Sequence, residues 1–305
     1  MLTSFDAIYT EITSLPKKRL VVAWGVDAHS ISAAAAAVKK GLVETTLVGD
    51  RELIGKTCAG ENIDPSIFNI VSIAEELPAV AKAVELVNTG EGDLLMKGLC
   101  SSDKYMRAIL NKEKGLLPPK AVLSHITLMA HEYYHKLLLV SDIAVIPVPD
   151  LHQKTVIVGY LVNTARRLGI TLPKVAVVAA TEQVLPGMPA CVEGAILAKM
   201  VDRGQIPGCL LDGPLSLDVS ISKEAASIKK VKSEVAGDAD CLLFPNLEAA
   251  NTFYKTITQL SPKAHIAAVV VGAKVPCVLS SRGDTAETKL NSIVLAALMS
   301  GKVKN

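Results

Sequence analysis

Short apolar runs alternate with stretches of helical periodicity along almost the whole chain. In the first half, the pattern predicts strands at 20–24, 43–48, 68–71 and 93–96, separated by helices at 30–40, 51–59 and 73–87. In the second half, it predicts strands at 174–179, 208–212 and 241–244, with helices at 155–168, 191–202, 223–234 and 247–258. Strands that alternate with helices form βαβ units, so the pattern predicts an α/β fold with mostly parallel sheets.

The length of 305 residues exceeds the usual size of a single hydrophobic core, so we expect two domains. Pro147 and Pro149 indicate a crossing between them. The last strand and helix are expected to complete the first domain, because they would otherwise extend an already complete α/β unit. The sequence therefore predicts a first domain of residues 1–146 and 277–305, and a second of residues 147–276.

The segment 280–289, S-S-R-G-D-T-A-E-T-K, is polar and lies between an apolar strand and a helix predicted over 286–301. A helix N-terminus presents unpaired N–H groups and a positive dipole end, which favour an anion. Arg282 adds a planar fork suited to phosphate or carboxylate, beside Ser280, Ser281 and Gly283. The segment therefore predicts an anion site.

Two carboxylates in the same segment have both a chemical and a structural interpretation. Asp284 and Glu287 lie in the same polar segment as Arg282, so both are candidate residues of the anion site. The spacing D-x-x-E before an apolar helix is also a capping-box variant, which would give both residues a structural role.

Further polar residues follow predicted strands, where ligands bind in open α/β sheets. Lys97 follows one strand and is succeeded by Lys104 and Arg107 on one helical turn, which predicts either a phosphate site or a solvated helix face. Asp212 and Asn246 follow two strands of the second half. Turn formation and N-capping are the alternatives for these two residues, especially for Asn246.

Composition narrows the classes of function. Half of the residues are hydrophobic but only 4% are aromatic, and the mean hydropathy of +0.37 suggests aliphatic cores and a homo-oligomer, with a homodimer as the first expectation. The 32 basic and 30 acidic residues are interspersed, so neither a nucleic-acid surface nor a membrane surface is predicted. Six widely spaced cysteines without a C-x-x-C motif, and no apparent signal or membrane segment, predict reduced thiols and a cytoplasmic location.

Three familiar motifs match the sequence poorly. His131, Glu132 and His135 spell H-E-x-x-H, but zinc binding through that motif requires a helix, and the apolar, β-prone residues after His135 favour a strand. Residues 49–57, G-D-R-E-L-I-G-K-T, have five residues between the glycines where a P-loop has four. No G-x-G-x-x-G follows the first strand, so a nicotinamide cofactor has no support.

Four ordered segments resemble the phosphate acetyltransferase and butyryltransferase family, with the butyryl branch as the nearer match. They are V-V-G-A-K-V-P-C-V-L-S-S-R-G-D-T-A-E-T-K-L, D-G-P-L-S-L-D-V-S-I-S, V-A-G-D-A-D-C-L-L-F-P-N-L-E-A-A-N and L-P-K-V-A-V-V-A-A-T-E. The resemblance extends to L-M-K-G near Met96 and to L-S-H at Ser124. It implies a two-domain, three-layer fold of the isocitrate and isopropylmalate dehydrogenase type, with a cleft between the domains.

The same resemblance implies a reaction and its participants. The expected enzyme transfers a short acyl group, butyryl by preference, reversibly between coenzyme A and inorganic phosphate. Acyl-CoA, phosphate and acyl phosphate are then substrates, and no tightly bound cofactor or metal is expected. Three alternatives remain, namely a phosphate acetyltransferase, a zinc hydrolase acting through His131, Glu132 and His135, and a noncatalytic coenzyme A binder.

The resemblance also assigns roles within the polar segment. It implies that Ser281 and Arg282 contact the acyl phosphate and that a carboxylate a few residues later deprotonates the thiol. In this chain that position holds Thr288, so Glu287 is the first candidate base and Asp284 the second.

Overall fold

The computed structural model describes residues 1–261, 263–279 and 284–301. Contacts within the chain divide it into two compact units. We call Phe5–Leu123, with the segment that begins at Ile266, the flanking unit, and Ser124–His265, with Met1–Ser4, the central unit. Each unit contains its own strands and helices, as the α/β pattern of the sequence predicts.

The flanking unit is built on strands in the order β3-β2-β1-β4-β11-β10. Their bounds are β1 (Lys18–Ala23), β2 (Val43–Gly49), β3 (Asn69–Ser72), β4 (Leu94–Lys97), β10 (His265–Val271) and β11 (Cys277–Val278). Neighbours from β3 to β11 are parallel, and β10 is antiparallel to β11. The chain moves outward from β1 through β2 to β3 and then returns to β4 on the other side of β1. The switch point of the topology therefore lies between β1 and β4.

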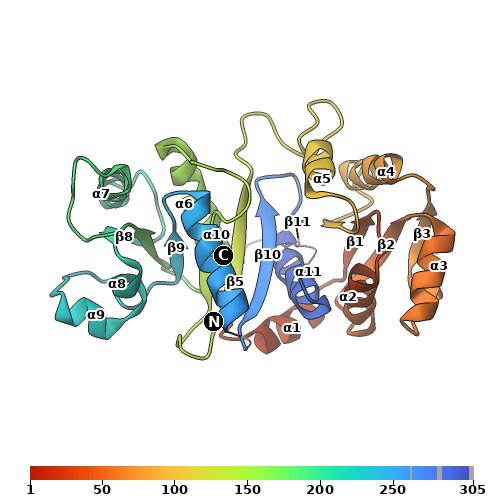
Figure 1. Cartoon of the computed structure of the whole chain (residues 1–305), viewed down its shortest axis with the longest axis horizontal. Helices are drawn as coiled ribbons and strands as arrows, with labels where there is room; N and C mark the ends of the chain where they lie inside the picture. Colours follow the sequence, from red (N-terminus) through yellow and green to blue (C-terminus); the bar gives the residue numbers. More distant parts are fainter. Residues whose placement is uncertain (262, 280–283, 302–305) are drawn as a thin grey trace. The chain divides into compact units, whose positions relative to one another are not determined.

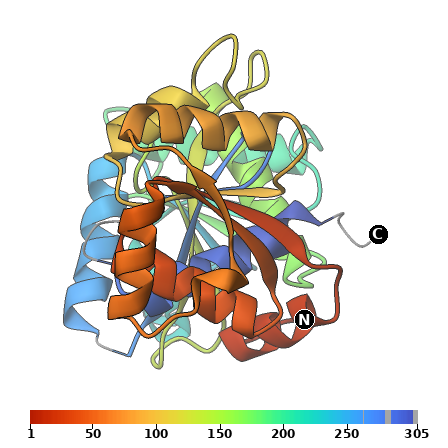
Figure 2. The same cartoon turned by 90° about the vertical axis from the view of Figure 1, so that its right-hand side faces the viewer.

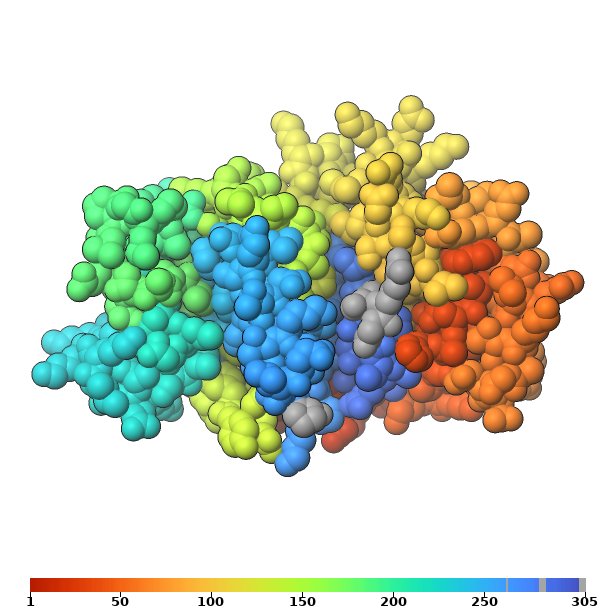
Figure 3. Space-filling view, in the orientation of Figure 1, coloured from red at the N-terminus to blue at the C-terminus, as the bar shows by residue number. Residues whose placement is uncertain are grey.

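Helices cover both faces of this sheet, and α4 lies on one face while α2 lies on the other (Figures 1 and 2). The helices of this unit are α1 (Phe5–Thr13), α2 (Ala28–Lys39), α3 (Arg51–Gly60), η1 (Pro65–Ile67), α4 (Glu76–Asn88), α5 (Ser102–Ile109) and α11 (Ala286–Ser300). Helix α11 packs against α1 and α2, and all of its residues from Lys289 to Leu298 are buried. The exposed segment that follows α5 projects from the surface (Figure 3).

The central unit has strands in the order β5-β6-β9-β7-β8, all parallel to their neighbours except the antiparallel pair β5 and β6. Their bounds are β5 (Ser124–Ala130), β6 (Leu138–Ser141), β7 (Lys174–Val178), β8 (Leu210–Leu215) and β9 (Cys241–Leu243). The helices are α6 (Leu151–Arg167), α7 (Pro189–Asp202), α8 (Leu217–Ile221), α9 (Lys223–Ile228) and α10 (Leu247–Leu260). The helix expected over 223–234 is shorter because the chain turns at Lys230, which has a φ of 56°.

The division between the units differs from the boundaries expected after residues 146 and 276. Strand β6 pairs with β9 and with β5, which places both β5 and β6 in the central unit. Strand β10 pairs with β11, which places residues 266–271 in the flanking unit. Strand pairing between distant segments sets these boundaries, and the prolines near residue 147 follow them by some distance.

All six cysteines are buried and none forms a disulfide. Burial raises the pKa of Cys100 and Cys209 to about 11, and that of Cys277 to about 12. These thiols therefore stay protonated at neutral pH. Separately, no helix in the described part of the chain has the length and hydropathy that crossing a bilayer requires.

Candidate active site

The carboxyl ends of β1 and β4 meet at the switch point of the flanking unit. Ala23 lies opposite Lys97 in the sheet, the N–H of Gly98 donates to the carbonyl of Ala23 at 2.9 Å, and that of Leu99 donates to the carbonyl of Trp24 at 3.0 Å. A side chain at Gly98 would come within 2.2 Å of the Trp24 carbonyl oxygen, so only glycine permits this approach. Beyond it, the two chains diverge into α2 and α5, as they do around ligands in other open α/β sheets.

Asp27 caps α2 at this edge. Its Oδ1 accepts a hydrogen bond from the N–H of Ser30 at 3.0 Å, which satisfies one of the free donors at the start of the helix. Its Oδ2 is buried and accepts no hydrogen bond from the described residues, and the buried Oγ of Ser30 likewise has no partner among them. A buried carboxylate oxygen without a donor is costly, so this edge holds an unsatisfied acceptor.

Lys97, a predicted phosphate-binding residue, ends β4 with its side chain inside the protein, where only 2% of its surface is exposed. Its ammonium group donates to the carbonyls of Gly98 at 3.2 Å and Cys100 at 3.0 Å. The side chain thus fixes the turn that follows the strand, and it places a positive charge at the switch point.

Lys289 brings a second buried lysine to the same region from the first turn of α11, with 3% of its surface exposed. Burial lowers the pKa of its amine, and the positive charge of Lys97 acts in the same direction. The carboxylates of Asp27 and Asp284 oppose this shift. Lys289 therefore shares one electrostatic environment with Asp27, Lys97 and Asp284.

The sequence prediction missed Lys289, although a signal was present. Lys289 occurs at i, i+4 spacing with Ile293 and Ala297, so it occupies a position on the buried face of an apolar helix. A lysine at such a position has to be matched by other charges or by hydrogen bonds. The periodicity alone could have singled it out.

Helix α11 is capped by Thr285 and not by Asp284, which corrects the capping-box prediction. The Thr285 hydroxyl accepts from the N–H of Thr288 at 3.1 Å, and the two threonine hydroxyl oxygens are 3.2 Å apart. Asp284 is half-buried and precedes the cap. Asp284 therefore does not cap the helix, and its negative charge acts on Lys289.

Glu287, the first candidate base, is exposed. Its charge acts on Tyr9 of α1, a helix that packs against α11. Burial and then the charge of Glu287 raise the pKa of Tyr9 to about 12, and the Tyr9 hydroxyl donates to Oδ1 of Asn291 at 2.6 Å. The structure thus places Glu287 near Tyr9 and places Lys289 near Asp27. The predicted residues Ser280, Ser281, Arg282 and Gly283 lie outside the described residues.

The two other basic candidates already have carboxylate partners. The Nζ of Lys104 lies 2.6 Å from Oε2 of Glu76, and the Nε of Arg107 lies 3.0 Å from Oδ1 of Asp103. The Arg107 side chain is 80% exposed, as expected for a solvated helix face. A phosphate role for Lys104 and Arg107 stays a prediction.

The candidates in the central unit make local hydrogen bonds. Ser124 is fully buried and its hydroxyl donates to Oδ2 of Asp142 at 3.0 Å. Oδ1 of Asp212 accepts from the N–H of Gly213 at 2.8 Å, within β8. Asn246 caps α10 by accepting from the N–H of Ala249 at 2.9 Å, which is the structural alternative that the sequence suggested. A binding role for these three residues stays a prediction.

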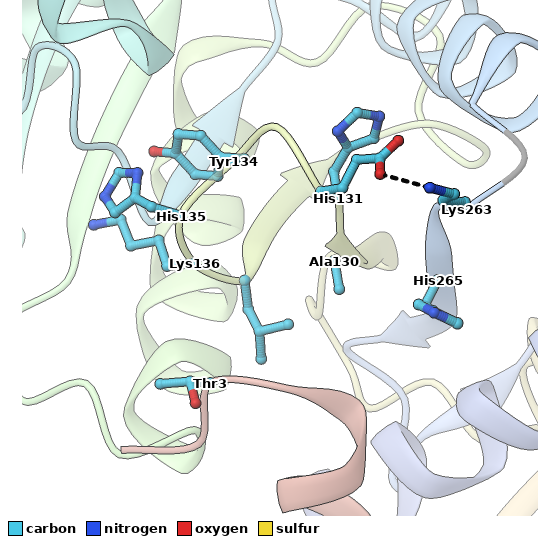
Figure 4. Close-up of a pocket in the computed structure, with 10 residues that line it drawn as sticks. Thr3, Ala130, His131, Tyr134, His135, Lys136, Lys263 and His265 are labelled. Atoms are coloured by element: carbon cyan, nitrogen blue, oxygen red, sulfur yellow. Dashed lines mark hydrogen bonds and ion pairs between the residues drawn. The ribbon is translucent and has the colours of Figure 1, made fainter.

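The H-E-x-x-H segment forms a turn between β5 and β6, and its two histidines point away from each other (Figure 4). His135 pairs with Oδ1 of Asp238 at 2.8 Å, and Glu132 pairs with Lys263 at 3.1 Å. His131, Glu132, His135 and Lys263 line a cavity of about 340 Å³. Zinc binding through this motif requires a helix, which the segment does not form, and no cluster of three metal-binding side chains occurs among the described residues.

Comparisons with known proteins extend over the whole chain. The family profile described as "Phosphate acetyl/butaryl transferase" matches residues 77–297. The chain is 42% identical over 301 residues to the phosphate butyryltransferase of Clostridium acetobutylicum, with 99% of each chain covered. It is 41% identical over 283 residues to the phosphate acetyltransferase of Thermotoga maritima, with 92% of this chain and 95% of that relative covered.

Solved structures agree with the fold predicted from the sequence. A branched-chain phosphotransacylase from Enterococcus faecalis matches with a TM-score of 0.81 at 27% identity, over 93% of this chain and 99% of that one. A 4-hydroxythreonine-4-phosphate dehydrogenase from Klebsiella pneumoniae matches with a TM-score of 0.55 at 12% identity, over 93% of this chain and 100% of that one. The second likeness concerns the fold alone, and it confirms the predicted α/β fold of the dehydrogenase type.

Proposed function

Because the chain belongs to the phosphate acetyl/butyryl transferase family, we propose that it transfers a short acyl group reversibly between coenzyme A and inorganic phosphate. The observation that carries this proposal is the 42% identity to a phosphate butyryltransferase over 99% of both chains. Substrates are then acyl-CoA, phosphate and acyl phosphate, and no tightly bound cofactor takes part.

Butyryl is the preferred acyl group in this proposal. The phosphate butyryltransferase of Clostridium acetobutylicum matches at 42% identity over nearly full length, whereas the phosphate acetyltransferase of Thermotoga maritima matches at 41% over a shorter stretch. A single extra methylene in an apolar pocket changes binding by about 1–3 kcal/mol, so a preference for butyryl should appear as a clear difference in rate. Rates with acetyl-CoA, butyryl-CoA and branched acyl-CoA at equal concentration decide between them.

The proposed chemistry needs a thiolate and a stabilised leaving group. The thiol of coenzyme A resembles that of cysteine, with an unperturbed pKa of about 8.5, so a base raises its reactive fraction at neutral pH. The thiolate attacks the carbonyl carbon of the acyl phosphate. Arg282 and the N-terminus of α11 bind the phosphoryl oxygens, while Ser281 donates to the developing oxyanion.

Thiol release from butyryl-CoA, measured with and without phosphate, tests the proposed function. A phosphate acyltransferase releases coenzyme A only when phosphate is present. A hydrolase releases it in both conditions, and a noncatalytic binder releases it in neither. Either of the last two results would contradict the proposal.

Arg282→Ala tests the assignment within the polar segment. We expect the variant to remain folded and to lose at least about 100-fold in the rate of phosphate-dependent thiol release, because one transition-state donor is worth 10²–10³ in kcat. Arg51→Ala removes the same charge from an exposed position at the start of α3 and serves as the matched control. Equal activity of the two variants would exclude Arg282 from the site.

We further propose a homodimer or higher homo-oligomer in the cytoplasm. Large apolar side chains remain exposed on and before α7, namely Val184, Leu185, Met188 and Ile196. An apolar surface of this kind is typical of interfaces between subunits. The buried, unpaired thiols suit a reducing compartment. Light scattering after size-exclusion chromatography measures the oligomeric state, and a monomer would contradict the proposed homo-oligomer.

A further inference from the structure

Lys289 occupies a position that is unfavourable for a permanently charged amine. Only 3% of its surface is exposed. It lies in the first turn of α11, where the helix dipole is positive. The buried ammonium of Lys97 adds a charge of the same sign nearby. Burial, the dipole and the like charge all disfavour the protonated form.

A carboxylate at the start of α2, the helix that packs against α11, acts on the charge of this lysine. Oδ2 of Asp27 is buried and accepts no hydrogen bond from the described residues, and its charge acts on Lys289. The other groups that bear on Lys289 are Lys97 at the end of β4 and Asp284 before α11. Packed elements also bring Tyr9 from α1, which is bonded to Asn291, and the buried thiol of Cys277 from β11. Asp27 and Asp284 are thus the counter-charges that make protonation possible.

The residue that the family resemblance makes the base is Thr288 here, and the structure engages it in the helix cap with Thr285. The next residue in the chain, Lys289, carries a buried amine on which the charge of Lys97 at the end of β4 acts. We propose that Lys289 exchanges the proton of the coenzyme A thiol and that Asp27 is the positioning counter-charge that keeps this amine able to do so. This inference rests on the proposed function and assigns the proton transfer of that same site.

The step balances in the direction of acyl-CoA formation. The neutral amine of Lys289 takes the thiol proton, the sulfur forms a bond to the acyl carbon, and the bond from that carbon to the phosphate oxygen breaks with its electron pair on oxygen. The ammonium group then gives the proton to the departing phosphate, which leaves as HPO₄²⁻. In the reverse direction, the neutral amine takes the proton of HPO₄²⁻ as the phosphate oxygen attacks the thioester, and the ammonium group so formed protonates the departing thiolate. Each turnover therefore begins and ends with the neutral amine.

Lys289→Met and Lys289→Arg test the proton transfer in phosphate-dependent thiol release from butyryl-CoA. We expect Lys289→Met to lose at least about 100-fold in kcat, as general acid–base groups do, and a small primary amine added to the assay to restore part of it. Lys289→Arg should stay similarly inactive, because guanidinium keeps its proton throughout the working range of pH. Retention of more than a tenth of wild-type kcat in either variant would overturn the proposal.

The pH profile of Asp27→Asn gives a second readout that a structural role would not alter. Asparagine keeps the N-cap of α2, so folding should be preserved while the negative charge is lost. Without that charge, the Lys289 ammonium loses its proton at lower pH, so the rise of kcat on the acid side should move down by roughly one pH unit. Lys97→Met should move it upward, because a like charge is removed. Coincident profiles for wild type and Asp27→Asn would overturn the assignment.

The two levels of the proposal fail in different ways. If the wild-type protein releases no thiol in the presence of phosphate, the proposed function itself is wrong. If the wild type is active and the Lys289 variants are folded and equally active, only the proton-transfer assignment is wrong. Thermal unfolding of each variant supplies the folding control.

Discussion

Ser292 joins α11 to the sheet of the flanking unit, and its removal should have a measurable cost. Ser292 is fully buried, and its hydroxyl oxygen accepts from the N–H of Ala268 in β10 at 2.9 Å. The same hydroxyl donates to the carbonyl of Thr288 at 2.7 Å, one turn earlier in the helix. Ala268 is only 4% exposed, so Ser292→Ala would leave its N–H buried without this acceptor.

The magnitude follows from these contacts. A buried donor without an acceptor costs about 1–3 kcal/mol. Alanine has the higher helix propensity, which returns up to about 0.5 kcal/mol, and the Thr288 carbonyl retains its helical environment. We therefore expect Ser292→Ala to lower the free energy of unfolding by about 0.5–2.5 kcal/mol, which shifts Tm down by up to several degrees for a unit of this size.

Ser300→Ala is the matched control, because Ser300 lies on the same helix, is only half-buried and donates to the carbonyl of Ala297 at 2.9 Å. It makes the same chemical change without removing an acceptor from the sheet, so its effect should stay within about 0.5 kcal/mol. Urea midpoints measure the difference between the variants, and amide exchange at Ala268 locates it. If both variants unfold at the same midpoint with equal protection of Ala268, the Ser292 bond does not contribute to stability.

Two ion pairs of the central unit give further predictions. Lys154 is buried and pairs with Glu193, so Lys154→Met should lower the free energy of unfolding by about 3 kcal/mol. The double variant with Glu193→Gln should recover much of this loss in urea unfolding, and additive losses would contradict the prediction. Partial burial would raise the pKa of Asp238, but hydrogen bonds from Lys174 and His135, among others, hold it well below its usual range. Its folded pKa is thus below the unfolded value of about 3.9, so the stability lost in Asp238→Asn should be largest near pH 7 and shrink below about pH 4; a constant difference in urea midpoint would refute it.

Most elements of the fold could be predicted because their residues carry local signals. The apolar runs and helical periodicities place β1, β2, β7 and α7 within a few residues of their observed bounds. The turn at His135 could also be anticipated, because the β-prone residues after it exclude a continuous helix. Which strands pair could not be predicted, because the pairing of β6 with β9 joins segments about 100 residues apart and has no local signature.

The site was predictable in part for the same reason. Lys97 could be found because it follows an apolar strand, whereas the importance of Asp27 depends on the burial of its Oδ2, which only the folded chain shows. Lys289 was missed, although its place on the buried face of an apolar helix was a signal in the sequence. The cap is Thr285 and not Asp284 because the helix begins one residue later than the D-x-x-E spacing suggests. Sequence patterns do not resolve a helix start to one residue.

The burial of the cysteines also determines whether this protein exchanges disulfides with a thiol substrate. Disulfide exchange proceeds through an accessible thiolate, and the six thiols of this chain are enclosed, with the pKa of Cys100, Cys209 and Cys277 raised to about 11 or 12. Oxidised coenzyme A should therefore form mixed disulfides with the folded protein very slowly. A chromogenic disulfide added to a running reaction would then react with the thiol of released coenzyme A and not with the cysteines of the folded enzyme. Its absorbance would therefore report each turnover directly for as long as the protein stays folded.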